Sequence, residues 1–207
     1  MIAHPYLDPT RNGANVIGLD LSLTGSGIAA IDVAAGQLST AVHGSPPPAV
    51  DTLSAHVARH CTLTDGIVAQ VIAADPVLVV VEGLQFSVKG KDSSVARRGF
   101  LWWAVTAGLC NAGVPVMEVT PQQIKQFATG RGNSSKSQVA AAYALAWPHA
   151  TRDKNIEDRA DASFAAALGA AWLGVPGLPI SKTVARIKVL SKLPEPTLPP
   201  RLLRSVA

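Results

Sequence analysis

The chain has 207 residues, of which 48% are hydrophobic and 15% are charged, and this composition excludes an intrinsically disordered protein. The net charge of +4 and the isoelectric point near 9.3 are compatible with a polyanionic partner if the positive charges cluster. Two uncharged stretches, residues 99–117 and 162–181, are interrupted by glycine and proline, so we expect buried helices rather than membrane spans. The two cysteines do not form a metal-binding motif with each other or with histidine. This pattern fits a reducing compartment, and we expect a cytoplasmic protein.

Three consecutive strands are predicted near the N-terminus. After a lead over residues 1–14, the apolar runs 15–23, 28–33 and 38–43 are separated by turns that contain glycine. This order is typical of an antiparallel meander. The helical spacing of apolar residues over 51–74 then predicts a long helix.

Buried strands and helices alternate in the second half of the chain. Residues 77–81 (VLVVV) are apolar throughout, as expected of a central parallel strand that is buried on both faces. The elements predicted after it are a helix over 93–112, a strand over 114–119, and helices over 121–127, 135–147 and 156–173. The basic tail over 175–207 is rich in proline, which leaves room only for a short helix around 184–190.

This order of elements predicts a single α/β domain over residues 15–174. Its sheet would be mixed and five-stranded, an antiparallel meander followed by parallel strands, and helices would cover both faces. The N-terminal lead and the C-terminal tail would lie outside this domain.

Four acidic residues occupy positions that a simple core pattern does not explain. Asp20 interrupts the first strand, and Glu82 ends the most apolar strand of the chain. Asp158 and Asp161 are three residues apart on a predicted helix, so they project from the same face. If that helix lies across the sheet, its first turn brings both carboxylates to Asp20 and Glu82. Protons or bound cations must then relieve their mutual repulsion.

Clustered carboxylates of this kind favour a site for hard cations. Carboxylate oxygens without a Cys or His cluster select Mg²⁺ or Mn²⁺ over zinc, and two such ions about 3.5–4 Å apart support in-line phosphodiester hydrolysis. Each acid alone has a simpler interpretation, because an Asp near a strand end can be a turn residue and an Asp pair can favour a helix dipole. Asp20 and Glu82 are placed at buried strands, where neither explanation applies.

Four segments resemble, in order and spacing, the motifs of the RuvC-type Holliday junction resolvases, which belong to the RNase H-like nuclease superfamily. The segments are residues 16–27 (VIGLDLSLTGSG), 80–82 (VVE), 115–138 and 158–162 (DRADA). The first segment alone also looks like the phosphate-binding hairpin of actin-like ATPases and sugar kinases, whereas the four together are more specific. The similarity covers residues 15–172 and suggests a phage or actinobacterial variant.

The resemblance implies roles for individual residues. The catalytic acids that it implies, holding two Mg²⁺ ions per site with Mn²⁺ able to substitute, are Asp20, Glu82, Asp158 and Asp161. Lys125 and Lys136 would lie near the scissile phosphate, with solvated surface charge as the alternative. Phe86 would stack on an unpaired base, with simple packing as the alternative.

Basic residues around the site predict a path for DNA. The residues expected to bind DNA are Phe86, Lys89, Lys91, Arg97, Arg98, Lys125, Arg131 and Lys136. Tail cations such as Lys182 and Arg186 would either wrap DNA or carry solvated linker charge. The resemblance implies that the helix over 93–112 forms the interface of a homodimer. Residues 100–103 (FLWW) are consistent with this, because they give the helix more apolar surface than one sheet can cover.

We therefore expect a Mg²⁺-dependent endodeoxyribonuclease of the crossover junction type, a homodimer that nicks Holliday junctions or other branched DNA in the cytoplasm of a bacterium or a phage-infected cell. Three alternatives stay open: an RNase H-like nuclease for flaps or RNA/DNA hybrids, an actin-like ATP-binding kinase domain, and a DNA-binding scaffold without catalysis. The chain is short for the kinase fold and has no second glycine-rich phosphate hairpin.

Overall fold

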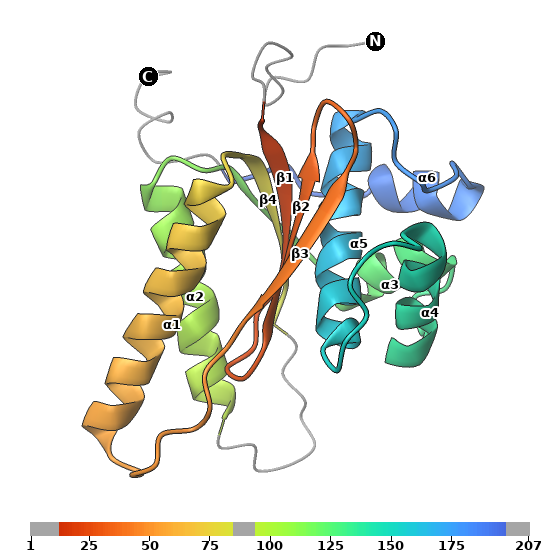
Figure 1. The fold of residues 1–207 in the computed structure, drawn as a ribbon. Helices are drawn as coiled ribbons and strands as arrows, with labels where there is room; N and C mark the ends of the chain where they lie inside the picture. Colours follow the sequence, from red (N-terminus) through yellow and green to blue (C-terminus); the bar gives the residue numbers. More distant parts are fainter. Residues whose placement is uncertain (1–12, 85–93, 198–207) are drawn as a thin grey trace.

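A five-stranded sheet runs through the middle of the molecule and has helices on both sides (Figure 1). The computed structural model describes residues 13–84 and 94–197. The strands are β1 (Asn15–Asp20), β2 (Ser26–Asp32), β3 (Leu38–His43), β4 (Pro76–Glu82) and β5 (Val116–Val119). They lie in the order β3-β2-β1-β4-β5. The first three pair antiparallel, while β1, β4 and β5 pair parallel, which confirms the predicted mixed sheet.

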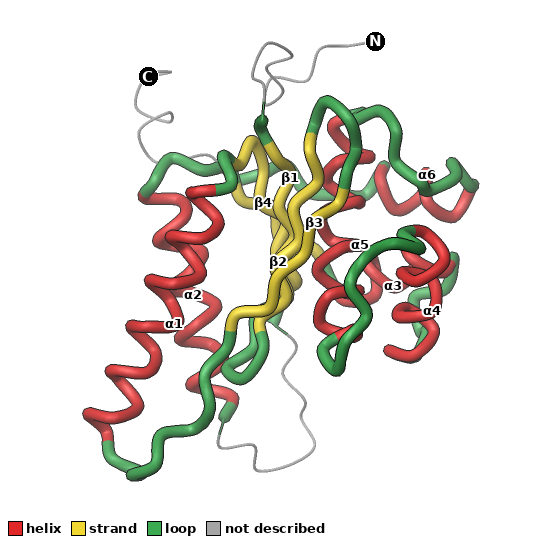
Figure 2. The backbone as a smooth tube through the Cα atoms, viewed as in Figure 1, coloured by secondary structure: helices red, strands yellow, loops and turns green. Residues whose placement is uncertain are grey.

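The helices form one layer on each face of the sheet, with further helices outside α5. They are α1 (Leu53–Ala73), α2 (Val95–Asn111), α3 (Pro121–Thr129), α4 (Lys136–Ala146), α5 (Ile156–Leu173) and α6 (Val184–Leu190). Helices α1 and α2 cover one face, and α5 covers the other with α3, α4 and α6 beyond it (Figure 2). No helix in the described part of the chain combines the length and apolarity that a membrane span needs.

Two helices begin later in the structure than the sequence analysis predicted, and the reason is the same for both. Thr52 and Ser135, which the sequence analysis placed inside helices, are N-caps. The Thr52 hydroxyl accepts a hydrogen bond from the backbone N–H of Ala55, and the Ser135 hydroxyl accepts one from the N–H of Gln138. Each cap satisfies an amide that the first helical turn leaves unpaired.

The two faces of β1 and β4 contribute to separate cores, as their continuous apolarity predicted. Val16 and Val80 point toward α5, whereas Ile17 and Val81 point toward α1 and α2. All four side chains are fully buried. Because side chains alternate along a strand, even-numbered residues of both strands face α5.

Helix α5 lies directly on the sheet because glycine and alanine meet at the contact. A Cβ on Gly18 of β1 would collide with the carbonyl oxygen of Ala162, and a Cβ on Gly27 of β2 would collide with the carbonyl oxygen of Asp158. Ala162 and Ala166 of α5 are themselves fully buried there. The helix backbone therefore approaches the strands without an intervening layer of large side chains.

We expect Gly18→Ala to lower the free energy of unfolding by about 1–3 kcal/mol, because the added methyl group overpacks the contact with α5. Gly99→Ala is the matched control, since a Cβ at this position of α2 would meet nothing within 4 Å. It should leave stability unchanged or raise it by up to about 1 kcal/mol through helix propensity. Urea unfolding of the three proteins measures the difference, and equal stability of wild type and Gly18→Ala would contradict the close approach.

Candidate active site

The ends of two neighbouring parallel strands bring Asp20 and Glu82 together. Asp20 is the last residue of β1 and Glu82 is the last residue of β4, and the preceding residues Leu19 and Val81 are paired. Both acids have even numbers, so their side chains point to the face that α5 covers. Each is partly buried. The strand pairing alone thus places two carboxylates beside each other at one edge of the sheet.

The first turns of α5 bring the other two acids to the same edge. Asp161 is 6% exposed, and Asp158 lies one turn nearer the start of the helix. The Asp158 carboxylate lies beside Gly25 in the turn between β1 and β2, where a Cβ would meet its Oδ2 atom at 3.2 Å. Asp158 and Asp161 both raise the pKa of Asp20 by charge repulsion, after the larger effect of burial. The structure therefore brings the four predicted acids together.

The start of α5 is fastened by Arg159, which lies between the two acids in the chain. Its Nε and Nη2 atoms donate to the Asp153 carboxylate at 3.1 and 2.8 Å, and Nη1 donates to Thr40 Oγ1 at 3.0 Å. The hydrogen bond from Arg159 lowers the pKa of Asp153 to about 2. The sequence analysis did not assign Arg159 this contact. It joins the turn before α5 to the edge strand β3.

Two lysines on neighbouring helices lie close to the acids. Lys136 begins α4 after the Ser135 cap, and its Nζ atom lies 3.9 Å from Asp161 Oδ2. Lys125 lies in α3, close enough for its charge to oppose the raised pKa values of Glu82 and Asp161. Both lysines that the sequence analysis selected therefore lie at the acidic site.

Burial and charge repulsion raise the pKa values of the carboxyl groups. Burial, followed by the charge of Asp161, raises the pKa of Asp20 to about 7. Burial, followed by the charge of Asp20, raises the pKa of Glu82 to about 8, and burial raises that of Asp161 to about 6. Burial lowers the pKa of Lys136, but attraction to the acids outweighs this effect and the pKa is raised. The site thus attracts positive charge near neutral pH.

The donor set fits a hard divalent cation in chemistry and charge. Its ligands are carboxylate oxygens, which Mg²⁺ and Mn²⁺ prefer, and a bound cation offsets the repulsion that raises their pKa values. Within residues 13–84 and 94–197, however, no three acid, His or Cys side chains are already gathered into a metal-binding cluster. The acids at the strand ends and the start of α5 interact through their charges, and the Lys136 Nζ atom lies 3.9 Å from Asp161 Oδ2.

Comparison with known proteins identifies the family. The family model described as "Crossover junction endodeoxyribonuclease RuvC" matches residues 16–168 of this chain. The chain belongs to the RuvC family. A curated RuvC of Sorangium cellulosum strain So ce56 is 32% identical in an alignment of 139 positions, which covers 61% of this chain and 75% of the relative. The predicted family and the predicted endodeoxyribonuclease activity are confirmed, and the actin-like kinase alternative is set aside.

Solved RuvC structures have the same fold. Thermus thermophilus RuvC superimposes with a TM-score of 0.58 at 23% identity, covering 78% of this chain and 97% of that one. A second structure, T. thermophilus RuvC in complex with Holliday junction substrate, has a TM-score of 0.58 at 21% identity and covers 74% and 92% of the two chains. The predicted RNase H-like fold is confirmed. RuvC-family nucleases depend on divalent metal ions.

Three of the other predicted DNA-binding residues of this RuvC chain, Phe86, Lys89 and Lys91, lie outside the described residues. Arg97 lies at the start of α2, on the opposite face of the sheet from α5, and its Nη2 atom is 3.9 Å from Asp51 Oδ1.

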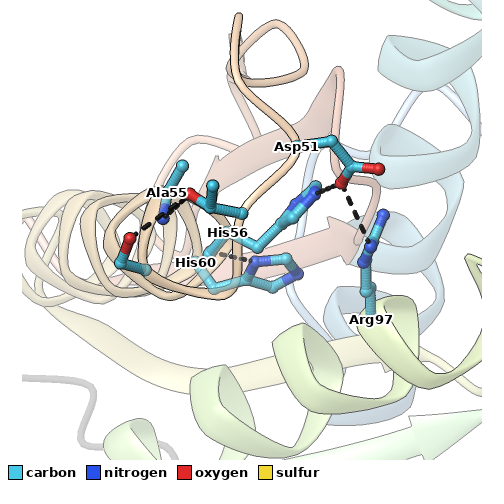
Figure 3. Close-up of polar contacts among 7 residues, drawn as sticks. Asp51, Ala55, His56, His60 and Arg97 are labelled. Atoms are coloured by element: carbon cyan, nitrogen blue, oxygen red, sulfur yellow. Dashed lines mark hydrogen bonds and ion pairs between the residues drawn. The ribbon is translucent and has the colours of Figure 1, made fainter.

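Figure 3 shows the Asp51 carboxylate between Arg97 and His56, whose Nε2 lies 2.6 Å from it. Arg98 follows on the same helix, and Arg131 is exposed in the turn after α3. Binding of DNA by these residues stays a prediction.

Trp102 contacts the site in a way that the sequence analysis missed. We grouped it with the apolar dimer surface, but it is buried and its Nε1 donates to the Glu82 carbonyl oxygen at 2.8 Å. Phe100 and Trp103 remain 54% and 66% exposed on the same helix. Helical spacing was the available signal, because Trp102 shares a face with the buried Val105 whereas Phe100 and Trp103 share another.

The raised pKa values predict that metal-free protein loses stability as the pH rises. The unfolded chain ionises its carboxyl groups near pH 4, whereas the folded site keeps protons until about pH 7–8, so unfolding releases protons in this window. We expect the free energy of unfolding, measured with urea in EDTA, to fall from about pH 5 to about pH 8. The fall should be smaller in Asp20→Asn, which removes one of these groups.

The same experiment with Mg²⁺ tests the donor set. At about pH 8 the added ion should stabilise wild type by binding only the folded state, and it should stabilise Asp20→Asn much less. Equal pH dependence and equal Mg²⁺ stabilisation of the two proteins would contradict the proposed electrostatics.

Proposed function

We propose that this RuvC-family endonuclease resolves Holliday junctions by hydrolysing phosphodiester bonds at the acidic edge of the sheet. The observation that carries the proposal is the convergence of four carboxylates with a lysine at 3.9 Å from Asp161. The curated relatives named crossover junction endodeoxyribonucleases support it. So does the shared fold with the T. thermophilus RuvC that was solved with its junction.

The proposed metal ligands are Asp20, Glu82, Asp158 and Asp161. Their oxygen donors favour Mg²⁺, with Mn²⁺ as a substitute, and four carboxylates supply enough negative charge for two ions. When bound, such ions supply activation of a water molecule and neutralisation of the phosphoryl oxygens. Partial burial of the carboxylates strengthens their attraction for cations, because the surrounding protein screens charge less than water does.

The chain's own cations and backbone contacts complete the proposed site. Lys136, held near Asp161, and Lys125 of α3 offer positive charge where a scissile phosphate approaches the carboxylates. Trp102 holds the backbone of Glu82 through its carbonyl oxygen, which limits movement of that carboxylate. Arg131, which is exposed after α3, would line the DNA backbone together with Lys125 and Lys136.

We infer a homodimer that presents two active sites to opposing strands of branched DNA. Support comes from α2, where Phe100 and Trp103 expose large apolar surfaces one turn apart. A symmetric dimer would bury both aromatic side chains on each protomer, and aromatic residues are frequent at the centre of such interfaces. Because its substrate would be chromosomal or phage DNA, we place the enzyme in the cytoplasm of a bacterium or an infected cell.

We expect Glu82→Gln to lower the rate of junction cleavage with Mg²⁺ by about 100-fold or more, because a neutral amide binds the cation poorly. Glu118→Gln, an exposed acid on the adjacent strand β5, is the matched control and should cleave like wild type. The assay compares a synthetic four-way junction with linear duplex, a flap and an RNA/DNA hybrid. Preferred cleavage of a flap or hybrid would favour the alternative substrates, and equal rates for Glu82→Gln and wild type would contradict the role of Glu82.

We expect Trp103→Ala to raise the dissociation constant of the dimer by about 30-fold, since truncating a central aromatic residue costs about 2 kcal/mol. Leu145→Ala removes a comparably exposed apolar side chain from α4 and should leave the dimer unchanged. Sedimentation analysis of the three proteins measures the constants. A monomeric wild type, or equal constants for wild type and Trp103→Ala, would reject this interface.

A further inference from the structure

The chain beyond the matched family region packs back onto the catalytic domain. The RuvC family model ends at residue 168, and the structure describes the chain as far as residue 197. Within this extension, α6 packs against α3, the helix that carries Lys125 (Figure 1). The contact centres on Arg186, which the sequence analysis treated as tail charge.

The Arg186 guanidinium group binds the C-terminal end of α3. Its Nε donates to the carbonyl oxygen of Phe127 at 2.7 Å, and its Nη2 donates to that of Ala128 at 2.9 Å. Nη1 donates to the carbonyl oxygen and the hydroxyl of Ser181 at 2.9 and 3.1 Å. The group also lies 5.9 Å from the centroid of the Phe127 ring. A side chain with so many internal partners is not linker charge and is not free to wrap DNA.

These contacts provide hydrogen-bond donors for carbonyl groups at the C-terminal end of α3. The last carbonyl groups of a helix have no partners within the helix, and a cation near them also interacts favourably with the helix dipole. The last turn of α3, which is described throughout, contains no basic residue of its own. Gly130 caps the helix by donating its N–H to the Gln126 carbonyl oxygen, and Arg186 satisfies the next two carbonyls.

The extension is held at a second point as well. Thr197 forms a two-way backbone bridge with Val116 of β5, with N···O distances of 2.7 Å and 3.3 Å. The segment between α6 and Thr197 therefore returns to the edge of the sheet, and α6 is anchored on both sides. A fixed α6 presents Arg186 to α3 in one geometry.

We propose that Arg186 is a positioning residue that fixes the end of α3 and thereby holds Lys125 at the acidic site. Lys125 lies two residues before Phe127, whose carbonyl Arg186 binds, so movement of that turn moves the lysine. The Thr129 hydroxyl donates to the Lys125 carbonyl oxygen at 2.8 Å and links the lysine to the same turn. This inference rests on the proposed function for the role of Lys125, whereas the contact between α6 and α3 does not.

The variants are Arg186→Lys, which keeps the charge but loses the planar fork, and Arg186→Ala. Lys188→Ala is the matched control, because it removes an exposed cation from the same helix. Hydrogen exchange of the α3 amides is the first readout and does not depend on activity. In Arg186→Lys the amides of Gln126 to Gly130 should exchange at least about 10-fold faster, while those of α5 should be unchanged. Unchanged exchange in α3 would overturn the proposed contact.

Junction cleavage under single-turnover conditions is the second readout. Arg186→Lys should lower the rate by about 10-fold or more at saturating DNA, because a misplaced lysine loses its alignment with the phosphate. In a Lys125→Ala background the same substitution should change the rate by less than about twofold. A full additional loss in that background, or fast α3 exchange with an unchanged rate, would overturn the positioning role. If Lys125→Ala alone leaves the rate unchanged, the proposed function of Lys125 fails, and the exchange result still decides whether Arg186 holds α3.

Discussion

The close approach of α5 to the sheet is the constraint on which the active site depends. Gly18 and Gly27 remove the side chains that would keep this helix away, and small residues on α5 complete the contact. The first two turns of α5 carry Asp158 and Asp161, so the separation between helix and sheet also sets their distance from the acids on β1 and β4. The same contact buries a large part of the core. Stability and the arrangement of the site therefore have one structural origin.

At the acidic edge of the sheet, repulsion between the carboxylates opposes the close packing of α5 on the strands. Burial and neighbouring charges raise the pKa values of Asp20 to about 7 and of Glu82 to about 8, which shows that ionised carboxylates are unfavourable there. Lys136 offsets part of the negative charge from α4. A domain selected for stability alone would gain from apolar residues at these strand ends, so the acids there fit the proposed role in binding cations.

Two side chains remote from the acids in sequence hold main-chain groups at the site. Trp102 of α2 donates to the carbonyl oxygen of Glu82, and Arg186 of α6 donates to carbonyl oxygens at the end of α3. In both cases a planar nitrogen donor binds a carbonyl group at the end of a secondary-structure element. Such contacts fix where a strand or helix ends. They use only backbone carbonyl groups, so the side chains of Glu82 and Lys125 take no part in them.

The sequence by itself determined the strands, the helices and the four candidate acids. Apolar runs and helical spacing reflect local rules, and carboxylates at Asp20 and Glu82 are conspicuous because they interrupt buried strands. Only the tertiary structure decided which cations reach the acids: Lys136 lies beside Asp161, whereas Arg97 pairs with Asp51 on the other face. It also decided that Arg186 binds α3. The physical reason is that a long basic side chain has many partners within reach, and the packing of elements far apart in the chain selects one of them.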